Sequence, residues 1–228
     1  MFTGIVQAMG TIATIERNAF GVRLVIDRRD WTPPGGYAPA PGDSICVSGV
    51  CLTTVVADAA AGTLAFDVIA ETLAKTSLGA RTVGSKVNLE PPVTANQPMG
   101  GHFMQGHVDG VGVVTGVLST PDEWRVTIEP PAALADYIIP KGSVALDGVS
   151  LTIASVDAGR FDVALIPTTL QLTTLGHTRE GDRINIEADI LAKTVVHFLR
   201  NHPAVGGGKP GGDPGVTMQT LRDAGFAG

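Results

Sequence analysis

The stretch SICVSGVCLT, residues 44–53, is repeated further along the chain as SVALDGVSLT, residues 143–152. Both copies contain the core Gly-Val-x-Leu-Thr, and the variable position is Cys51 in the first copy and Ser150 in the second. The residues around the first copy are rich in Val and Thr, which favours β-strand. A duplicated pocket with a thiol in one copy and a hydroxyl in the other is the main functional indication in the sequence.

Other segments recur in the same order. FDVIAETLAKTSLG (66–79) matches FDVALIPTTLQLTTLG (161–176), and GSKVNLE (84–90) matches GDRINIE (181–187). Near the N-terminus, the tripeptide Gly-Ile-Val matches a later Gly-His-Val. A period this long does not fit a solenoid and corresponds to one small domain per copy. We therefore expect two tandem domains with the same fold.

The composition is that of a folded soluble protein, since 44% of the 228 residues are hydrophobic and 17% are charged. The formal net charge is −6 without a cluster of Lys and Arg, which argues against a nucleic-acid partner. No apolar run approaches the length of a membrane span, and the N-terminus lacks the basic region of a signal peptide. Cys46 and Cys51, if extended, would lie roughly 16 Å apart, so we expect free thiols in a reducing cytoplasm.

Short alternating stretches separated by Gly, Pro and Asp turns fill residues 1–90, which favours a small antiparallel barrel or sandwich. One helical turn is expected at residues 71–75. Three prolines in residues 91–98 indicate a linker, after which the second copy repeats the strand pattern.

The segment ADILAKTVVHFLRN, residues 188–201, has apolar side chains at roughly helical spacing and no counterpart after the first copy. Such a helix would pack either between subunits or over its own barrel. The Gly- and Pro-rich residues from 202 onward indicate a flexible tail.

Several side chains could carry chemistry. Cys51 is either a small buried hydrophobic residue or a thiol facing a pocket, whereas Cys46 is expected in the core. The segment GGHFMQGHVDG contains His102, His107 and Asp109. His107 and Asp109 would lie on one face of a strand, and two such groups are too few for a metal site. The glycines match neither a dinucleotide nor a P-loop fingerprint. A histidine here is either a general acid or base or a structural residue.

The chain closely resembles riboflavin synthase of the α-chain type over about residues 1–200. The resemblance rests on MFTGIV, GVCLT, ETLAKTSLG, GGHFMQGHVDG, LDGVSLT, TTLG and GDRINIEAD. It implies an all-β fold of two tandem six-stranded Greek-key barrels, residues 1–90 and 100–188, joined by a linker at 91–99. It also implies a C-terminal α-helix at 189–201 that assembles a homotrimer, followed by the tail at 202–228.

The resemblance implies a dismutation in which two molecules of 6,7-dimethyl-8-ribityllumazine give riboflavin and 5-amino-6-ribitylaminouracil. One lumazine donates a four-carbon unit to the other, without cofactor or metal. Active sites shared between subunits, a cytoplasmic location and lumazine synthase as a candidate partner are expected on the same ground. The main alternative is a non-catalytic lumazine- or flavin-binding protein on the same fold, and a purely structural module is a third.

Site residues are carried over motif by motif. The polar candidates for catalysis are Ser44, Cys51, His107 and Asp189, with Phe2 lying over the site. The first pocket is expected to use Gly4, Ile5, Val6, Cys51, Leu52 and Thr53, then a strand over residues 67–72 with Asp67, Ile69, Glu71 and Thr72. The second is expected to use Gly106, His107, Val108, Lys141, Ser150, Leu151 and Thr152, then Ala164, Leu165, Ile166, Pro167, Thr168 and Thr169.

The expected chemistry needs a base and a nucleophile. His107 is the candidate base for the C7 methyl proton of one lumazine. The other lumazine would be activated at C7 by water, by its own ribityl hydroxyl or by Cys51. Thr168 departs from the glutamate that is usual in the family, which weakens the expected ribityl contacts of the second pocket.

Overall fold

In the computed structural model, which describes residues 1–29, 31–202 and 222, the first half of the chain forms a closed antiparallel barrel. Its strands lie in the order β1-β2-β5-β4-β3-β6, so the connection from β2 to β3 crosses over two strands in the Greek-key manner. The strands are β1 (Ala8–Arg17), β2 (Gly21–Asp27), β3 (Ser44–Val47), β4 (Val50–Asp58), β5 (Thr63–Ile69) and β6 (Lys86–Glu90).

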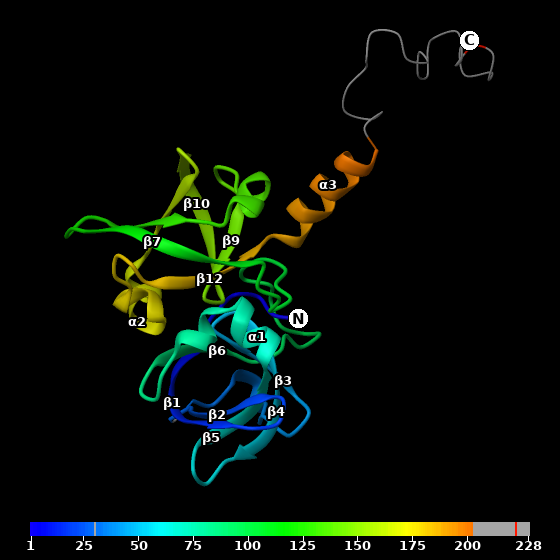
Figure 1. Ribbon diagram of the computed structural model, residues 1–228, viewed down its shortest axis with the longest axis vertical. Helices are drawn as coiled ribbons and strands as arrows, with labels where there is room; N and C mark the ends of the chain where they lie inside the picture. The colour runs from blue at the N-terminus through cyan, green and yellow to red at the C-terminus, as the bar shows by residue number, and fades with distance from the viewer. Residues whose placement is uncertain (30, 203–221, 223–228) are drawn as a thin grey trace. The chain divides into compact units, whose positions relative to one another are not determined.

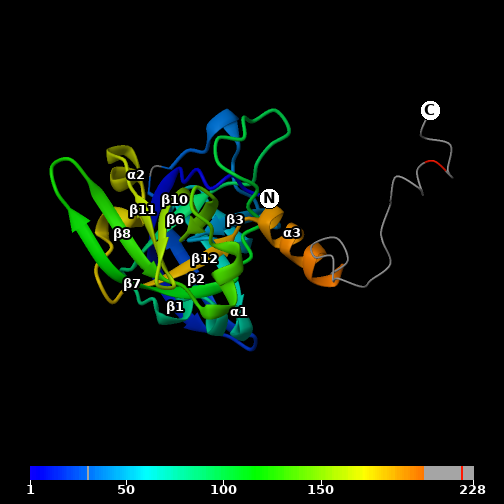
Figure 2. The same cartoon turned by 90° about the horizontal axis from the view of Figure 1, so that it is seen from above.

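The second half of the chain repeats this barrel. Its strands close in the order β7-β8-β11-β10-β9-β12, which is the order of the first barrel moved along by six strands. Figures 1 and 2 show the two sets of strands. These strands are β7 (Gly110–Ser119), β8 (Trp124–Glu129), β9 (Ser143–Leu146), β10 (Val149–Asp157), β11 (Arg160–Ala164) and β12 (Arg183–Ala188). The expected pair of six-stranded barrels is confirmed.

Alternation of side chains gives each barrel its own core. In β4, Val50, Leu52 and Thr54 are buried while Thr53 between them is exposed, as the two-residue period of a strand requires. The fully buried side chains of the first barrel include Ile12, Ile26, Phe66 and Leu89. Those of the second include Ile128, Leu146, Ile153 and Phe161.

Short helices follow β5 and β11 at equivalent places in the two repeats. They are α1 (Ala70–Lys75) with the 3-10 helix η2 (Ser77–Ala80), and α2 (Pro167–Leu172) with η4 (Thr174–His177). The helical turn expected at residues 71–75 is therefore present. The expected strand over residues 67–72 is wrong in its second half, because β5 ends at Ile69 and Thr72 lies in α1. Two more 3-10 helices are η1 (Pro34–Gly36) and η3 (Ala132–Tyr137).

The helix α3 (Ile190–Asn201) follows β12. The helix expected at the end of the second repeat is therefore present. The chain divides into two units, residues 1–193 and 194–228, and both barrels belong to the first. Among the described helices, each is too short or too polar to cross a bilayer. The expected flexible tail, apart from His202 and Arg222, lies outside the described residues.

Candidate active site

The segments that precede the two barrels are exchanged between them. The backbone N–H of Ser150, in the second barrel, donates to the carbonyl of Gly4 at 2.8 Å. The backbone N–H of Cys51, in the first barrel, donates to the carbonyl of Gly106, also at 2.8 Å. The side chains of the two segments are exchanged in the same way. Val6 is part of the core of the second barrel, and Val108 packs on the core of the first.

This exchange corrects the expected grouping of the pocket residues. The motif order predicts Gly4 and its neighbours in the pocket of Cys51, but they lie against Ser150. It predicts the segment around Gly106 beside Ser150, but that segment lies against Cys51. The two exchanged segments also pair with each other through a bridge between Phe2 and Met104.

The close approach explains why glycine stands at both contact points. Gly4 and Gly106 adopt φ angles of +77° and +76°, which favour glycine. A Cβ on Gly4 would lie 2.6 Å from the Cβ of Ser150, and one on Gly106 would lie 2.6 Å from the Cβ of Cys51. No other residue fits at these positions without moving the strand beside it.

A buried carboxylate at the end of each repeat holds each exchanged segment. Glu90, 2% exposed, accepts the backbone N–H and the hydroxyl of Thr3, at 2.6 and 2.7 Å, and the N–H of Gly4 at 3.0 Å. Glu187, also 2% exposed, accepts the backbone N–H groups of residues 105, 106 and 107 at 2.7 to 3.2 Å. Burial raises the pKa of both carboxyls, and the donated hydrogen bonds oppose that shift.

Ser150 contacts a histidine. The Nδ1 of His102 lies 2.7 Å from the Oγ of Ser150, and the ring is buried. Burial lowers the pKa of His102, while the charge of Asp189 acts in the opposite direction. The Nε2 atom is buried without a hydrogen-bond partner in the described part of the chain. A neutral imidazole with an uncommitted nitrogen can accept a proton.

The other expected base has a different environment. The backbone N–H of His107 donates to Glu187, and its side chain is exposed. Asp109, two residues further on, forms an ion pair with Lys193 at 2.8 Å. The structure therefore brings His102, rather than His107, against a hydroxyl of the repeated motif.

Cys51 lies on the outer face of its barrel. Its neighbours along β4, Val50 and Leu52, point into the barrel core, so Cys51 points the other way. It packs against a cluster of buried side chains that both repeats supply: Phe2, Cys46, Met104 and Ala145. Cys51 is half-buried there, so it is not part of the barrel's own core.

The two cysteines are closer than the extended-chain argument predicts. β3 and β4 form a hairpin in which Cys46 and Cys51 are directly opposite partners. Cross-strand partners share one face of the sheet, so Cys46 and Cys51 lie on the same face of the hairpin. Both are free thiols, and Cys46 is buried as expected. Burial raises the pKa of the Cys46 thiol well above its usual value.

Of the other catalytic candidates, Ser44 pairs with Thr53 on the hairpin face that also carries Cys51. Asp189 lies just before α3, where its carboxylate accepts the backbone N–H of Leu191 at 2.9 Å. Phe2, expected to lie over the site, is fully buried in the cluster against which Cys51 packs.

The remaining expected residues of the first pocket spread over β4, β5 and α1. Asp67 accepts two hydrogen bonds from Arg23, at 2.8 and 2.9 Å. Glu71 pairs with Lys75 at 2.6 Å on the exposed surface of α1. Leu52 belongs to the barrel core. Ile69 is exposed, as is Ile5 from the exchanged N-terminal segment.

The expected residues of the second pocket lie around β10, the end of β11 and α2. Lys141 is exposed in the turn before β9. A cavity of about 210 Å³ is lined in part by Ala164, Leu165 and Pro167. The other residues of this set are Leu151, Thr152, Ile166, Thr168 and Thr169, of which Thr152, Ile166 and Thr168 are exposed.

Three residues have roles in the structure that the motifs do not predict: His102, Glu90 and Glu187. The pairing of His102 with Ser150 joins positions far apart in the chain, so no local pattern indicates it. Glu90 and Glu187 did give a signal, because the repeated segments GSKVNLE and GDRINIE both end in glutamate.

Comparison with known proteins agrees with this duplicated arrangement. The model of the lumazine binding domain matches twice, at residues 3–91 and 105–189. The chain belongs to the riboflavin synthase family. A riboflavin synthase of Mycobacterium tuberculosis is 44% identical over 88% of this chain and 99% of its own length. One from Actinobacillus pleuropneumoniae is 36% identical over 99% of this chain and its own full length.

Solved structures show the same two-barrel fold. The protein LumP in complex with riboflavin superimposes with a TM-score of 0.72, at 27% identity over 82% of this chain and 99% of its own. LumP in complex with 6,7-dimethyl-8-(1'-D-ribityl) lumazine superimposes with a TM-score of 0.70, at 26% identity and the same coverage. Membership of the riboflavin synthase family confirms the expectation of an enzyme.

Proposed function

We propose that this protein catalyses the dismutation of two molecules of 6,7-dimethyl-8-ribityllumazine into riboflavin and 5-amino-6-ribitylaminouracil. The observation that carries this proposal is the pair of equivalent contacts around Gly4–Ser150 and Gly106–Cys51. They provide two similar sites that differ in one side chain, as one donor and one acceptor of the same compound require. Holding two substrates in register removes an entropy barrier of about 7–11 kcal/mol at best.

His102 and Ser150 supply the proton transfer in this proposal. The C7 methyl of a lumazine is acidic because its carbanion is delocalised into the ring. His102 is kept neutral by burial, so it can take that proton directly or through the hydroxyl of Ser150. In the other copy, Cys51 is the side chain available to add to C7 of the second lumazine.

A turnover assay tests the proposal. Purified protein is mixed with 6,7-dimethyl-8-ribityllumazine without cofactor or metal, and riboflavin formation is followed by absorbance. We expect one riboflavin for every two lumazines consumed. Binding with a fluorescence change but no riboflavin would instead identify a non-catalytic flavin-binding protein, and absence of binding would refute both.

Variants of Cys51 separate its two roles. If its thiol adds to the substrate, Cys51→Ser and Cys51→Ala both lose most of their turnover. If it only donates a hydrogen bond, Cys51→Ser retains turnover and Cys51→Ala does not. Equal, wild-type rates in both variants would remove Cys51 from the mechanism.

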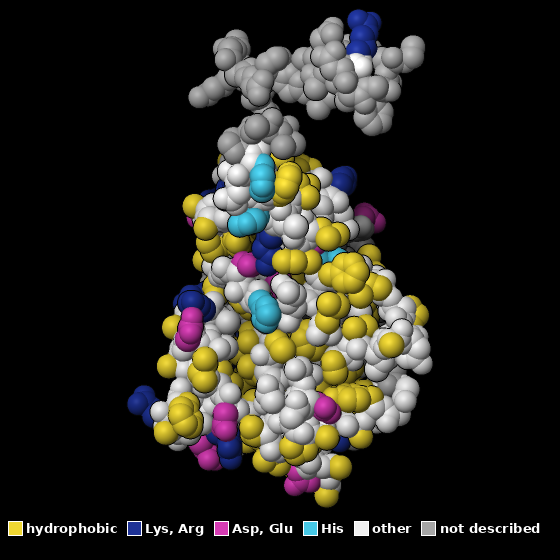
Figure 3. All heavy atoms as spheres, turned by 90° about the vertical axis from the view of Figure 1, so that its right-hand side faces the viewer, with side chains coloured by type: hydrophobic (Ala, Val, Ile, Leu, Met, Phe, Trp, Pro, Cys, Tyr) yellow, Lys and Arg dark blue, Asp and Glu magenta, His cyan; other side chains and the backbone are white. Residues whose placement is uncertain are grey.

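We further propose that the protein works as a homotrimer with active sites between subunits. Leu191, Val195, Phe198 and Leu199 of α3 are 47–58% exposed, an apolar surface that a partner subunit would cover. Hydrophobic side chains are also exposed across the face in Figure 3. Elsewhere in the described chain, Met1, Ile5, Met99 and Phe103 are 40–61% exposed.

Sedimentation of a chain ending after Ala188, where β12 ends, tests the role of α3. We expect the full chain to sediment as a trimer and the truncated chain as a smaller species. An unchanged trimer would contradict a role for α3 in assembly. The domain boundaries at residues 90, 99, 188 and 201, the cytoplasmic location and an association with lumazine synthase stay predictions of the family resemblance.

A further inference from the structure

The two cysteines face each other across the hairpin of β3 and β4. Cys46 and Cys51 are direct partners, one pair away from the turn that joins the strands. The backbone N–H of Cys51 donates to Gly106 rather than to Cys46, so this pair is of the non-hydrogen-bonded kind. The Cα atoms of such a pair are about 4.5 Å apart. A disulfide spans Cα separations of about 4.4–6.8 Å, so the backbone already suits one.

Both thiols belong to one cluster of side chains. Cys46 is 2% exposed and Cys51 is half-buried, and both pack with Phe2, Met104 and Ala145. Because cross-strand partners project from the same face of a sheet, rotation about χ1 is the only movement needed to bring the two sulfurs together.

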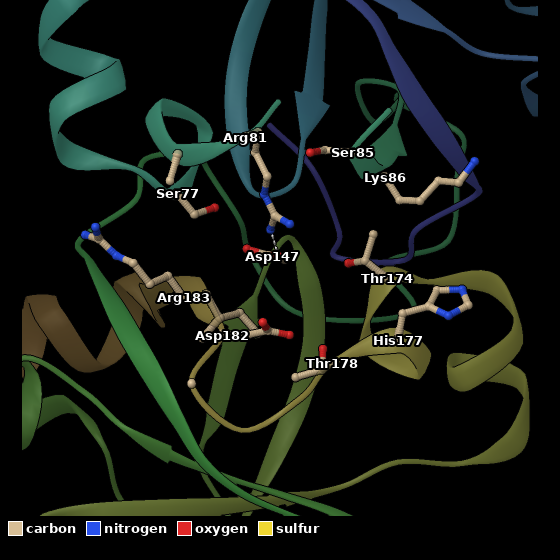
Figure 4. A pocket seen from close by; sticks show the side chains of 13 residues that line it. Ser77, Arg81, Ser85, Lys86, Asp147, Thr174, His177, Thr178, Asp182 and Arg183 are labelled. Carbon is tan, nitrogen blue, oxygen red and sulfur yellow. Dashed lines mark hydrogen bonds and ion pairs between the residues drawn. The ribbon is translucent and has the colours of Figure 1, made fainter. Parts of the chain in front are cut away.

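The turn of this hairpin lies against the second repeat. A Cβ on Gly148 would lie 2.7 Å from the backbone nitrogen of Gly49, so the equivalent turns of the two repeats are in close contact. Beside Gly148, Asp147 is paired with Arg81 at 2.9 Å, at a cavity of about 390 Å³ between the barrels (Figure 4). These contacts hold the turn in place and keep the two cysteines opposite each other.

The second repeat shows what the fold requires at these two positions. Ala145 stands in place of Cys46 and Ser150 in place of Cys51, and the two are partners in the same register. The hairpin therefore accepts alanine at the position of Cys46. What Cys46 adds to the first repeat is a second thiol beside Cys51.

We propose that Cys46 and Cys51 form a reversible redox pair, which a peroxide closes into a disulfide. The more exposed sulfur, that of Cys51, reacts first and takes one oxygen from the peroxide. The O–O bond breaks, and Cys51 sulfenic acid and water are formed. The sulfur of Cys46 then attacks that of Cys51, so that the S–S bond forms, the S–O bond breaks, and the hydroxyl leaves as water with the proton of Cys46. Two thiols are oxidised by two electrons, and the peroxide is reduced.

The surroundings of Cys46 suit the second step and not the first. Burial, followed by the charge of Glu90, raises the pKa of its thiol, which makes Cys46 unreactive toward the peroxide itself. Its reaction with Cys51 is intramolecular, so no encounter in solution is needed. The disulfide would close only a short loop and would constrain the unfolded chain little, so a thiol reductant can reopen it.

Closure of the disulfide removes the thiol of Cys51 from the site where its backbone meets Gly106. We therefore expect oxidation to stop turnover reversibly. This effect on turnover rests on the proposed function, whereas formation of the disulfide does not.

Mass spectrometry of the full chain after hydrogen peroxide, denaturation and alkylation tests the disulfide. The tryptic peptide of residues 30–75 contains both cysteines and no methionine, so methionine oxidation cannot obscure its mass. We expect this peptide to lose about 2 Da, the two hydrogens of the thiols, and to take up no alkylating reagent. Dithiothreitol should restore both alkylated thiols. Oxygen added to Cys51 with Cys46 still alkylated, or alkylation of both cysteines, would overturn the proposal.

Cys46→Ala is the matched variant, because alanine is the residue at the equivalent position of the second repeat. Its turnover before oxidation should equal that of the wild type. With peroxide and dimedone, which traps sulfenic acids, the variant should accumulate the Cys51 adduct because it has no second thiol. The wild type should form little adduct. Equal amounts of adduct in both proteins would contradict the redox pair.

Turnover separates the redox pair from the proposed function. The wild type should lose most of its turnover in peroxide and regain it in dithiothreitol. Cys46→Ala should not regain it after prolonged exposure, because its Cys51 is oxidised beyond the sulfenic acid. A disulfide that is present by mass but leaves turnover unchanged would refute a role of Cys51 in the dismutation, while a missing disulfide would refute the redox pair alone.

Discussion

The Nδ1 of His102 lies 2.7 Å from the Oγ of Ser150, and the remaining ring nitrogen is buried without a partner in the described chain. We expect His102→Gln to lower kcat by about 10²-fold or more, the usual contribution of a general base. His107→Gln, at the exposed histidine of the same segment, is the control and should have a smaller effect. If His107→Gln lowered kcat more than His102→Gln does, His107 rather than His102 would be the general base.

The pH profile provides an independent check on His102. Its lowered pKa keeps the ring neutral and able to accept a proton below the usual value of 6.5. We therefore expect kcat to fall only as the pH drops below about 6.5, and His102→Gln to abolish that limb. An acid limb unchanged in the variant would assign it to another group.

Glu90 and Glu187 act as matched anchors of the exchanged segments. In Glu90→Gln and Glu187→Gln, an amide NH₂ replaces one accepting oxygen and faces backbone donors. Each variant should lose about 2–3 kcal/mol of stability in urea unfolding. Each should also lose turnover, because its segment no longer lies firmly on Ser150 or Cys51. Wild-type kcat with reduced stability would limit both residues to a role in folding.

Substitutions at Gly4 and Gly106 test the close contact of these glycines with Ser150 and Cys51. An alanine at either position would force its Cβ to within 2.6 Å of the neighbouring strand, at a positive φ. We expect Gly4→Ala and Gly106→Ala to abolish most turnover and to cost about 1–3 kcal/mol or more. Gly116→Ala, where the nearest atom lies at 3.7 Å, is the control. Tolerance of all three changes would show that the segments shift freely.

Asp147 predicts a pH dependence of stability. Burial raises its pKa to about 6 from 3.8, while Arg81 lowers it and Asp182 raises it. The folded state therefore binds the proton more tightly than the unfolded state, and this group favours folding more at pH 4 than at pH 7. The stabilisation is about 3 kcal/mol well below pH 3.8, and it is lost as the pH rises from about 3.8 through 6. Asp147→Asn should flatten that slope in urea titrations, whereas an unchanged slope would assign it to Glu90 and Glu187.

The duplication and the two barrels could be predicted because repeated motifs in one order, alternating strands and turn residues are all local features. The partner of each leading segment could not, because Gly4 and Gly106 open similar tripeptides that fit either barrel. The pairing of Cys46 with Cys51 could not be predicted for a similar reason. It depends on the tight turn between β3 and β4, and the strand pattern alone does not specify that turn. The cavity between the barrels depends on tertiary contacts alone.

The exchange of the leading segments constrains how a nascent chain can mature. All six strands of the first barrel have left the ribosome once Glu90 has emerged, yet the segment that covers Cys51 follows at Gly106. Residues 1–6 must wait longer, because the strand that receives Gly4 begins at Val149. The newly made first barrel therefore lacks the segment that covers Cys51 until the chain has been made as far as Gly106.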